Sequence, residues 1–393
     1  MADACDYLLQ ALRGEGLSPQ EVQEAGASRA SQDAFAEKVA RLAAEGRLAY
    51  PRGAAYAEPF DMLFAALREE PLVWARHPRA ADLPLCAATS TSATAAMRAK
   101  FWAAPGGELL SSACAYARAD QISSHCNEEA RLASWGSSWS SPLDEWRHAP
   151  SARRAAQRAL MTALGQKAGL RAKDLREACW ELSQQRPPIF REATNFRPTT
   201  AAAIYRLFAA KAVLDPCAGW GDRALAAAAV GACYVGVDPS LRLHGGYESL
   251  RRACAAHGPA LLTFRPLPFE NYSAELCEQD FRGLGALGPD LVLFSPPYYD
   301  WEIYSSEPGQ SYQGQSWEAW QDGWLLPVAE KAWGLLRPGG FFAAYVNNVR
   351  GVSFGGFFRH MARVAGGRPT RIDCRRGSKR PLPLWVWMKP ASL

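Results

Sequence analysis

The regular alternation of short β-type runs and helical runs, which begins near residue 191, is the feature that most constrains the fold. Runs rich in valine, leucine, phenylalanine and tyrosine alternate with stretches of helical periodicity, which is typical of a parallel sheet covered by helices. The predicted strands are 211–215, 234–238, 261–266, 290–294, 339–346, 370–376 and 383–389, with a helix over 316–336. This spacing predicts a doubly wound α/β fold of seven strands, in which ligands bind beyond the carboxyl ends of the strands.

The chain divides into three ranges that differ in residue pattern. Residues 1–150 predict a mostly α-helical domain without a recognisable role, and 151–190 predict a connector of two helices rich in arginine and lysine. Residues 191–393 form the predicted α/β domain. The basic side chains of the connector have two interpretations, a solvated helix face or a surface that binds phosphates.

Composition limits the partners and the compartment. A net charge of +5 over 393 residues permits an acidic partner such as nucleic acid without requiring one. Ten cysteines occur singly, without a CxxC pair, which favours a reducing compartment and predicts neither disulfides nor a metal site. The uncharged run 224–237 is too short for a membrane span, and the first residues lack a signal-peptide pattern. We therefore expect an intracellular protein, cytoplasmic in a bacterium or phage and nuclear in a eukaryote.

The segment A-V-L-D-P-C-A-G-W-G-D-R, from residue 212, predicts a strand, a glycine-bearing turn and a helix. Asp215 ends the strand, while Gly219 and Gly221 allow a tight bend and a close approach to a ligand. Asp238 ends the next strand, where a carboxylate is placed to accept hydrogen bonds from ribose hydroxyls. The pattern is not G-x-G-x-x-G, and the carboxylate of Asp215 suits a ligand's ammonium group better than a pyrophosphate.

This loop resembles the cofactor loop of class I S-adenosylmethionine-dependent methyltransferases. The resemblance implies S-adenosyl-L-methionine as the cofactor, with its methionine end near 194–208 and its adenine ring near P-F-E-N-Y, from residue 268. The cofactor-binding residues that it implies are Phe196, Pro198, Thr199, Asp215, Cys217, Gly219, Gly221, Asp238, Phe269, Glu270 and Asn271.

A Ser295-Pro296-Pro297-Tyr298 tetrapeptide directly follows the predicted strand 290–294. Proline has no N–H, so the pair offers rigidly held carbonyl acceptors, which can draw the lone pair of an aromatic amine out of conjugation. The serine adds a hydroxyl, and the tyrosine adds a stacking face for a base. Proline pairs often only break a loop, but the position beside the cofactor loop favours a catalytic role.

The tetrapeptide resembles the catalytic motif of DNA amino-methyltransferases that act on cytosine N4 or adenine N6, and S-P-P-Y points to N4-cytosine. The longer string F-S-P-P-Y-Y-D-W-E-I-Y-S is similar to phage and bacterial members. The resemblance covers roughly 191–390, and the motif order is that of an unpermuted chain. It implies methyl transfer to a nucleobase in DNA, with Ser295, Pro296, Pro297 and Tyr298 as the catalytic residues.

Further polar and aromatic residues near the tetrapeptide are weaker candidates. The predicted substrate or nucleic-acid contacts are Tyr299, Trp301, Arg375, Arg376, Lys379 and Arg380. Asp300 and Glu302 have a possible role in orienting the amine, and Asn347 and Asn348 in lining the pocket. One alternative is the same methyl transfer to adenine N6, RNA, a protein amide or a small molecule. A second alternative is a non-catalytic scaffold that binds the cofactor. The sequence leaves the oligomeric state open.

Overall fold

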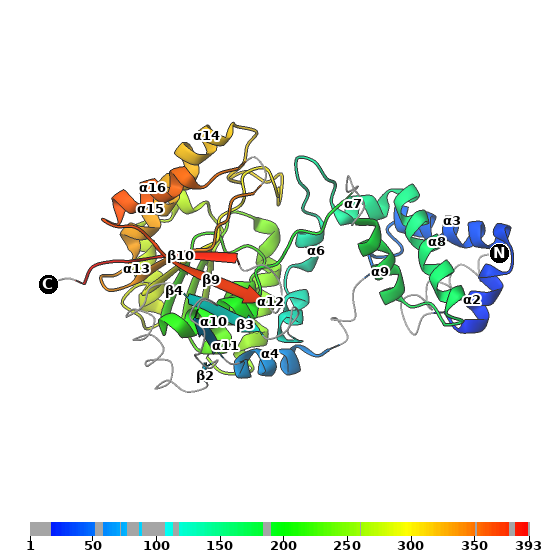
Figure 1. The fold of residues 1–393 in the computed structure, drawn as a ribbon, viewed down its shortest axis with the longest axis horizontal. Coiled ribbons are helices and arrows are strands. Elements are labelled where there is room, and N and C mark those ends of the chain that lie inside the picture. The colour runs from blue at the N-terminus through cyan, green and yellow to red at the C-terminus, as the bar shows by residue number, and fades with distance from the viewer. Residues whose placement is uncertain are drawn as a thin grey trace. The chain divides into compact units, whose positions relative to one another are not determined.

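The structure is a computed structural model, shown in Figure 1. It describes residues 17–51, 58–70, 72–76, 86–88, 107–112, 118–183, 190–259, 261–349, 352–376 and 382–391. The chain divides into two compact units. The helical unit comprises Met1–Glu58, Glu129–Thr194 and Trp301–Tyr304, and the sheet unit comprises Pro59–Glu128, Asn195–Asp300 and Ser305–Leu393. This division differs from the expected ranges, because residues 59–128 group with the sheet and a short segment near 300 groups with the helices.

The sheet unit contains the doubly wound sheet that the sequence predicts. All seven predicted strands are present, as β4 (Ala212–Asp215), β5 (Cys233–Val237), β6 (Leu262–Arg265), β7 (Leu291–Phe294), β8 (Phe341–Ala344), β9 (Thr370–Arg376) and β10 (Leu382–Met388). They lie in the order β9-β10-β8-β7-β4-β5-β6, in which β4 to β8 are parallel and β10 is antiparallel to both neighbours. From β4 the chain builds the sheet first toward β6 and then, from β7, in the opposite direction.

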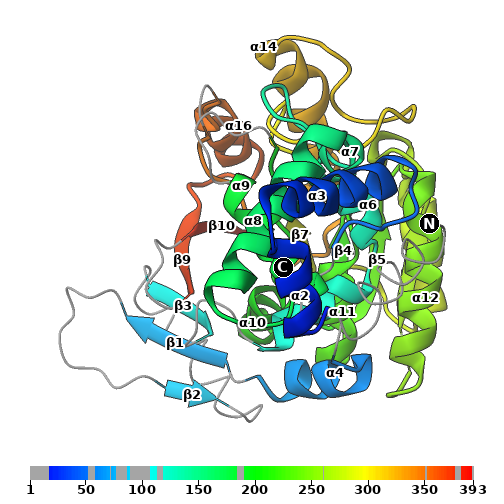
Figure 2. The same ribbon diagram turned by 90° about the vertical axis from the view of Figure 1, so that its right-hand side faces the viewer.

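Three further strands extend the sheet beyond β9 in a region that the sequence predicts to be mostly helical. They are β1 (Leu72–Arg76), β2 (Cys86–Ala88) and β3 (Gly107–Ser112), and they bring the sheet to ten strands among the described residues (Figure 2). β3 pairs in parallel with β9, and β1 is antiparallel to both β2 and β3. Because these short strands are stabilised by pairing with a distant edge, local periodicity does not reveal them.

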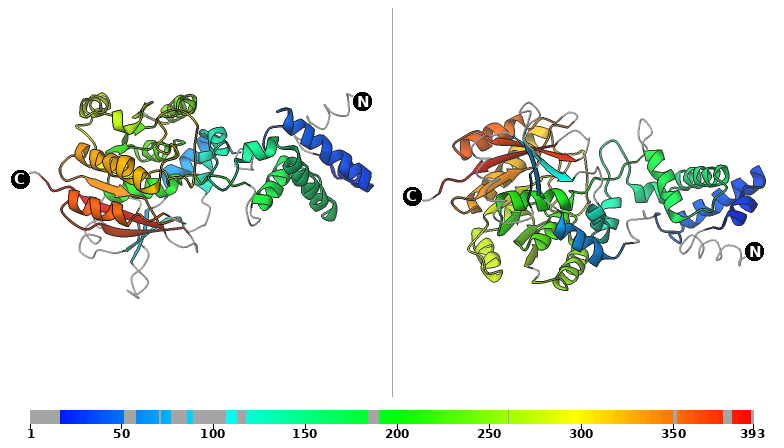
Figure 3. Two further views of the ribbon diagram at one scale, coloured as in Figure 1. Left: turned by 90° about the horizontal axis from the view of Figure 1, so that it is seen from above. Right: turned by 60° about the horizontal axis from the view of Figure 1, so that its bottom comes forward.

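Helices cover both faces of the sheet (Figure 3). Alternate strand residues point to opposite faces, so Val213 and Leu291 contribute to one core while Leu214 and Val292 contribute to the other. The first core includes helices α4 (Phe60–Glu69), α10 (Pro198–Phe208), α11 (Asp222–Val230) and α12 (His244–Ala255), together with the 3₁₀ helix η2 (Arg118–His125). The second includes α13 (Ala274–Gly283), α15 (Leu326–Leu335) and α16 (Gly355–Val364).

The predicted helix over 316–336 contains an irregular turn. It comprises α14 (Trp317–Trp320), a π-helical segment η5 (Gln321–Leu325) and α15. Ser316 caps its start by accepting a hydrogen bond from the backbone N–H of Ala319. π-Helical turns inside α-helices frequently lie near functional sites, and this one follows the loop that begins at the Ser-Pro-Pro-Tyr tetrapeptide.

The described helices of the helical unit are α2 (Pro19–Gly26), α3 (Arg29–Ala44), α6 (Glu128–Leu132), α7 (Pro142–Arg147), α8 (Ala149–Gly165) and α9 (Ala172–Ser183). The first residue of α6, Glu128, is assigned to the sheet unit. Their shared core includes Phe35 and Val39 of α3, Leu160 of α8 and Trp146 of α7. The two predicted connector helices are thus present as α8 and α9, and they pack into this unit. None of the described helices is both long and apolar enough to cross a membrane.

Candidate active site at the switch point of the sheet

The two sequence motifs lie at the carboxyl ends of adjacent parallel strands. β4 pairs with β7 through Val213 and Leu291 and through Leu214 and Val292, so Asp215 and Ser295 follow neighbouring strand ends. The order of the strands reverses at this pair, because the chain continues from β4 to β5 on one side and from β7 to β8 on the other. Open α/β sheets bind their ligands in the crevice at such a switch point.

Asp215 takes part in a buried ion pair. Its side chain has no exposed surface, and its Oδ2 atom lies 2.6 Å from Nε of Arg223 in the first turns of α11. The Tyr234 hydroxyl donates a second hydrogen bond to the same oxygen at 2.7 Å. Although burial opposes the charged guanidinium, Asp215 and Tyr234 keep the pKa of Arg223 above its usual value. The carboxylate therefore holds the loop together and has its charge compensated within the protein.

Asp238 lies at the end of β5, where it contacts the glycine-bearing turn. Its Oδ2 atom accepts a hydrogen bond from the backbone N–H of Gly219 at 2.9 Å, and Oδ1 accepts one from Ser240 at 3.0 Å. Burial raises the pKa of Asp238 to about 6, while these backbone hydrogen bonds act in the opposite direction. Each carboxylate oxygen has more than one acceptor site, so Asp238 retains capacity for further donors.

The two glycines of the turn have left-handed backbone conformations, with φ of 58° at Gly219 and 101° at Gly221. A Cβ atom on Gly219 would meet only ordinary contacts, 3.8 Å from the carbonyl oxygen of Cys217 and 4.0 Å from Arg223. The backbone at Gly219 therefore faces space, beside the carboxylate of Asp238. A Cβ atom on Gly221 would instead lie 2.9 Å from Leu250, so this glycine permits close packing against α12.

The remaining residues expected near the cofactor have different environments. Phe196 packs against Tyr345 with ring centroids 4.7 Å apart, and it lies under the guanidinium of Arg223. Pro198 and Thr199 are buried in the first turn of α10, and the Thr199 hydroxyl donates to Asp120 at 2.7 Å. The other members of the set are half-buried Cys217, buried Phe269, and exposed Glu270 and Asn271.

The Ser-Pro-Pro-Tyr tetrapeptide directly follows β7. Pro296 is buried, and Ser295, Pro297 and Tyr298 are half-buried. The Tyr298 ring contacts Phe354 edge to face, with centroids 5.7 Å apart, and its hydroxyl lies 3.4 Å from the carbonyl oxygen of Tyr345. Since the Tyr345 ring also packs on Phe196, one hydrogen bond and one aromatic contact connect the tetrapeptide with the segment that leads into α10.

The residues just after the tetrapeptide separate into two groups. Tyr299 stays in the sheet unit, whereas Trp301 and Glu302 belong to the helical unit. The Trp301 carbonyl oxygen accepts a hydrogen bond from the indole N–H of Trp139 at 3.2 Å, and its ring lies under Arg191. Glu302 accepts a hydrogen bond from Tyr304 at 2.7 Å, and burial raises its pKa.

The other weaker candidates have structural contacts or lie outside the described side chains. Asn348 accepts a hydrogen bond from the backbone N–H of Phe354 at 2.9 Å, as expected of a turn-forming asparagine, and Asn347 is exposed. Arg375 and Arg376 belong to β9, but their side chains are not among those described. Lys379 and Arg380 lie outside the described residues.

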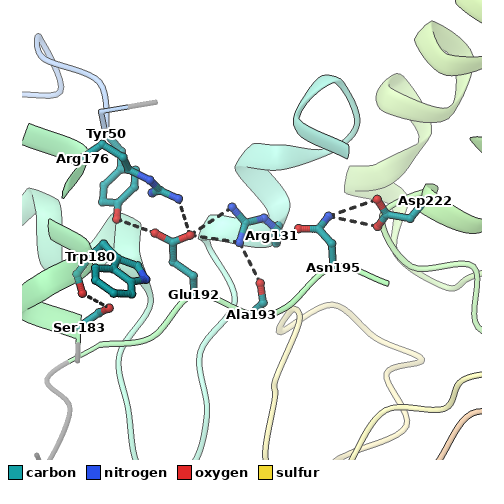
Figure 4. Close-up of polar contacts among 9 residues, drawn as sticks. All are labelled: Tyr50, Arg131, Arg176, Trp180, Ser183, Glu192, Ala193, Asn195 and Asp222. Atoms are coloured by element: carbon teal, nitrogen blue, oxygen red, sulfur yellow. Dashed lines mark hydrogen bonds and ion pairs between the residues drawn. The ribbon is translucent and has the colours of Figure 1, made fainter. Parts of the chain in front are cut away.

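A charged network of the helical unit centres on Glu192 (Figure 4). Its carboxylate forms ion pairs with Arg131, at 3.4 Å, and with Arg176, and it accepts a hydrogen bond from Tyr50 at 3.1 Å. Arg131 also donates to the carbonyl oxygen of Ala193 at 2.8 Å. Glu192 thus links α6 and α9 to the segment that leads out of the helical unit.

Several basic side chains of α8 and α9 are paired with carboxylates of the same unit. Arg153 lies 3.6 Å from Asp33, and Arg158 forms an ion pair with Glu181. Arg176 pairs with Glu192, as described above. These pairs favour a structural interpretation of the basic connector over a phosphate-binding surface.

Sequence reasoning missed a second polar cluster at the start of α11. Asp222 is buried and accepts hydrogen bonds from the Ser123 hydroxyl and from the Asn195 side chain, at 3.1 Å for the nearer contact with Asn195 (Figure 4). Asp120 similarly accepts from Arg197 and Thr199. The position of Asp222 directly after the second glycine was a visible signal, but its partners are distant in sequence. Among the described residues, no group of three histidine, cysteine or carboxylate side chains is arranged to hold a metal ion.

Comparisons with known proteins give likenesses among solved structures only. No protein-family model matches the sequence, and no curated protein matches it. A SAM-dependent methyltransferase from Agrobacterium tumefaciens is similar over 51% of this chain and 64% of its own, with 17% identity and a TM-score of 0.34. TrmN from Thermus thermophilus is similar over 49% of each chain, with 20% identity and a TM-score of 0.30.

A third similar structure, a putative SAM-dependent methyltransferase from Streptococcus mutans, covers 51% of this chain and 52% of its own, with 14% identity and a TM-score of 0.34. The matched region thus spans less than two thirds of each of these three proteins. At this level of similarity, the assignment of the fold rests on the strand order and on the helices that cover both faces of the sheet.

Proposed function

We propose that the protein transfers a methyl group from S-adenosyl-L-methionine to an exocyclic amino group of a nucleobase. The observation that carries this proposal is the Ser-Pro-Pro-Tyr tetrapeptide at the carboxyl end of β7, beside the glycine-bearing turn that follows β4. Proline pairs often only break a loop, but this pair follows a strand at the switch point of the sheet, where we propose that its carbonyl groups accept hydrogen bonds from the ligand.

The residues of the turn fit such a cofactor in part. Asp238 has free acceptor capacity for ribose hydroxyls, and Gly219 leaves space beside it for close approach. Asp215 does not fit the expected role as partner of an ammonium group, because Arg223 already compensates its buried charge. We assign to Asp215 and Arg223 the positioning of the turn instead.

The bound cofactor supplies an electrophilic methyl group to the site. Ser295 and the carbonyl groups of the tetrapeptide accept hydrogen bonds from the target amine, which localises its lone pair on nitrogen. Tyr298 holds the ring of the base, so that the amine is aligned with the methyl group. S-adenosyl-L-methionine would supply its methyl group to the amine nitrogen and leave as S-adenosylhomocysteine, and the amine proton would pass to solvent.

Cytosine N4 in DNA is the proposed target, because Ser-Pro-Pro-Tyr resembles the motif of amino-methyltransferases that act on that atom. A base within a duplex has to leave the stack before it reaches such a site, at a cost of about a few kcal/mol. The paired arginines of α8 and α9 favour, as a second candidate, an amine acceptor outside duplex DNA, such as RNA or a small molecule.

A transfer assay with radiolabelled cofactor tests the proposal, using duplex DNA, single-stranded DNA and RNA in parallel, followed by digestion to nucleosides. We expect label in N4-methylcytosine. Label in N6-methyladenine corrects the base and keeps the mechanism. Label in none of the polymers, with the cofactor still bound, contradicts nucleobase methylation and favours a protein or small-molecule acceptor.

A pair of variants connects activity to the tetrapeptide. Ser295→Ala combined with Tyr298→Ala is expected to abolish transfer while the cofactor still binds. Ser249→Ala on the exposed face of α12 is the matched control, since its hydroxyl only donates to a carbonyl of its own helix. Unchanged transfer by the double variant would falsify the assignment of the tetrapeptide.

A further inference from the structure

The loop Ser305–Gln315, which follows the catalytic region, contacts both sides of the candidate active site. At its start, Glu307 accepts hydrogen bonds from the hydroxyls of Ser240, at 2.5 Å, and Ser305, at 2.9 Å. Ser240 in turn donates its backbone N–H to Asp238. The loop is therefore connected through two hydrogen bonds to the carboxylate at the end of β5.

A glycine of the loop brings it against the same edge of the sheet. Gly309 has φ of 87°, and a Cβ atom there would lie 2.9 Å from Pro268 and 3.3 Å from Pro239. Pro239 directly follows Asp238, and Pro268 begins the segment expected near the adenine ring. Only glycine permits both the backbone conformation and this close approach.

The end of the loop holds the residue after the tetrapeptide. The Tyr299 hydroxyl donates to the carbonyl oxygen of Gln315 at 2.6 Å, and the Gln315 side chain donates back to Ser311 at 2.8 Å. The ring of Tyr299 contacts Tyr312 and Trp317 edge to face, with centroids 5.0 Å and 5.7 Å apart. Tyr299 is thus enclosed by the loop and by the helix that follows it.

The backbone of Tyr299 makes these contacts necessary. Its φ of 58° is left-handed, a conformation that is strained for a residue with a Cβ atom. Such strain persists only where the surroundings over-determine the conformation, and it often lies at functional sites. Because Tyr299 directly follows Tyr298, its conformation sets the direction in which the chain leaves the tetrapeptide.

We infer that Glu307 and Tyr299 are positioning residues, through which the loop Ser305–Gln315 couples the cofactor edge at Asp238 to the catalytic tetrapeptide. This inference rests on the proposed function. Burial raises the pKa of Glu307, but the hydrogen bonds from Ser240, Ser305 and the Arg242 backbone together leave it below its usual value. Glu307 is therefore a charged acceptor, which suits a permanent contact at the cofactor edge.

Two conservative variants test the coupling. Tyr299→Phe removes one hydroxyl, and Glu307→Gln removes one charge while it keeps the shape. Each is expected to lower kcat at saturating cofactor by about tenfold, the equivalent of one hydrogen bond. Glu307→Gln also raises the Kd of the cofactor several-fold, whereas Tyr299→Phe leaves that Kd unchanged. Glu278→Gln on α13, whose ion pair with Arg282 is exposed, is the control.

The double variant separates coupling from two independent effects. If both residues act through one loop, the double variant loses no more kcat than the worse single variant. The inference is overturned if the losses of kcat in the two single variants multiply in the double variant, or if Tyr299→Phe leaves kcat unchanged. In either case, methyl transfer by the wild-type protein still supports the proposed function.

A second measurement does not depend on the methyl acceptor. Hydrogen exchange at 298–300 is expected to slow when S-adenosylmethionine is added to the wild-type chain and to stay unchanged in Glu307→Gln at equal cofactor occupancy. Equal slowing in both proteins overturns the coupling. A wild-type chain that does not bind the cofactor at all contradicts the proposed function and the inference together.

Discussion

Arg223 reaches back from α11 to Asp215 at the end of β4, so that the two ends of one turn are joined by a fully buried ion pair. Coulomb attraction in a buried environment compensates the desolvation of both groups only while both are present. The glycine-bearing turn is thereby held together from the inside, and Gly219, with open space beside it, donates its backbone N–H to Asp238 on another side of the turn.

Replacement of Arg223 by methionine is expected to destabilise the protein strongly. The variant leaves the buried carboxylate of Asp215 without its cationic partner, which typically costs about 3–5 kcal/mol. The midpoint of urea unfolding measures the loss. Arg251→Met is the control, because its ion pair with Glu248 is about half exposed and is worth at most roughly 1 kcal/mol. Equal shifts in the two variants contradict the buried-pair interpretation.

Cofactor binding is expected to weaken as the pH falls through about 6, the value to which burial raises the pKa of Asp238. A carboxylate accepts hydrogen bonds from ribose better in its charged form, so protonation raises the Kd of the cofactor. Calorimetric titrations between pH 5 and pH 8, at a constant salt concentration of about 0.15 M, measure the Kd of the cofactor at each pH. Asp238→Asn should bind weakly at every pH, and a wild-type Kd that does not depend on pH contradicts the role of Asp238.

The same carboxyl group has the opposite effect on the unbound protein. Its folded-state pKa lies above the usual value, so between the usual pKa and about 6 the folded state binds more protons than the unfolded state. This group's contribution to the free energy of unfolding therefore decreases as the pH rises through that window. Thermal unfolding of the wild type and Asp238→Asn without cofactor compares the two slopes, and the variant should show the shallower decrease.

Loss of the Glu192 charge is expected to destabilise the helical unit. Glu192→Gln leaves Arg131 and Arg176, both largely buried, without their carboxylate, at a cost of about 3–5 kcal/mol. Hydrogen exchange in α9 reports on this unit directly. Glu181→Gln, whose ion pair with Arg158 is more exposed, should change exchange in α9 far less.

A single methyl group at residue 136 is expected to disturb the helical unit. A Cβ atom on Gly136 would clash with the Trp139 indole nitrogen and the Trp301 carbonyl oxygen, which are themselves hydrogen-bonded. Overpacking of this kind costs typically about 1–3 kcal/mol. Gly165→Ala, in open space at the end of α8, should be neutral or stabilising. A Gly136→Ala variant as stable as the wild type contradicts the close packing at Trp301.

Most strands from β4 to β10 were predictable because they are short apolar runs bounded by polar or turn-forming residues, whereas β6 and β9 alternate apolar and polar residues. Their neighbours also follow from the sequence, since parallel strands connected by helices allow few orders. β1, β2 and β3 were not predictable, because β2 has three residues and the set gains its stability from pairing with β9. The irregular turn at Gln321–Leu325 has no local signal either.

The candidate site also has a part that the sequence predicts and a part that it does not. The positions of Asp215, Asp238 and Ser295 at strand ends follow from the strands themselves. The partners of those residues do not, because Arg223 could have turned to solvent, and Glu307 is 67 residues from Ser240 along the chain. The environment of Trp301 was the least predictable, since its contacts in the helical unit involve residues more than a hundred positions earlier.

The assignment of Trp301–Tyr304 to the helical unit affects how the protein can be dissected. Ile303 exchanges two backbone hydrogen bonds with Trp135, at 3.0 Å and 2.6 Å. A fragment that begins at residue 191 lacks Trp135 and therefore loses both bonds. Such a fragment would also lack Asp120 and Ser123, which hold the starts of α10 and α11. No single truncation point leaves two fragments that each keep all of these contacts. If a truncated protein is inactive, loss of the fold is therefore the first explanation, ahead of loss of a catalytic residue.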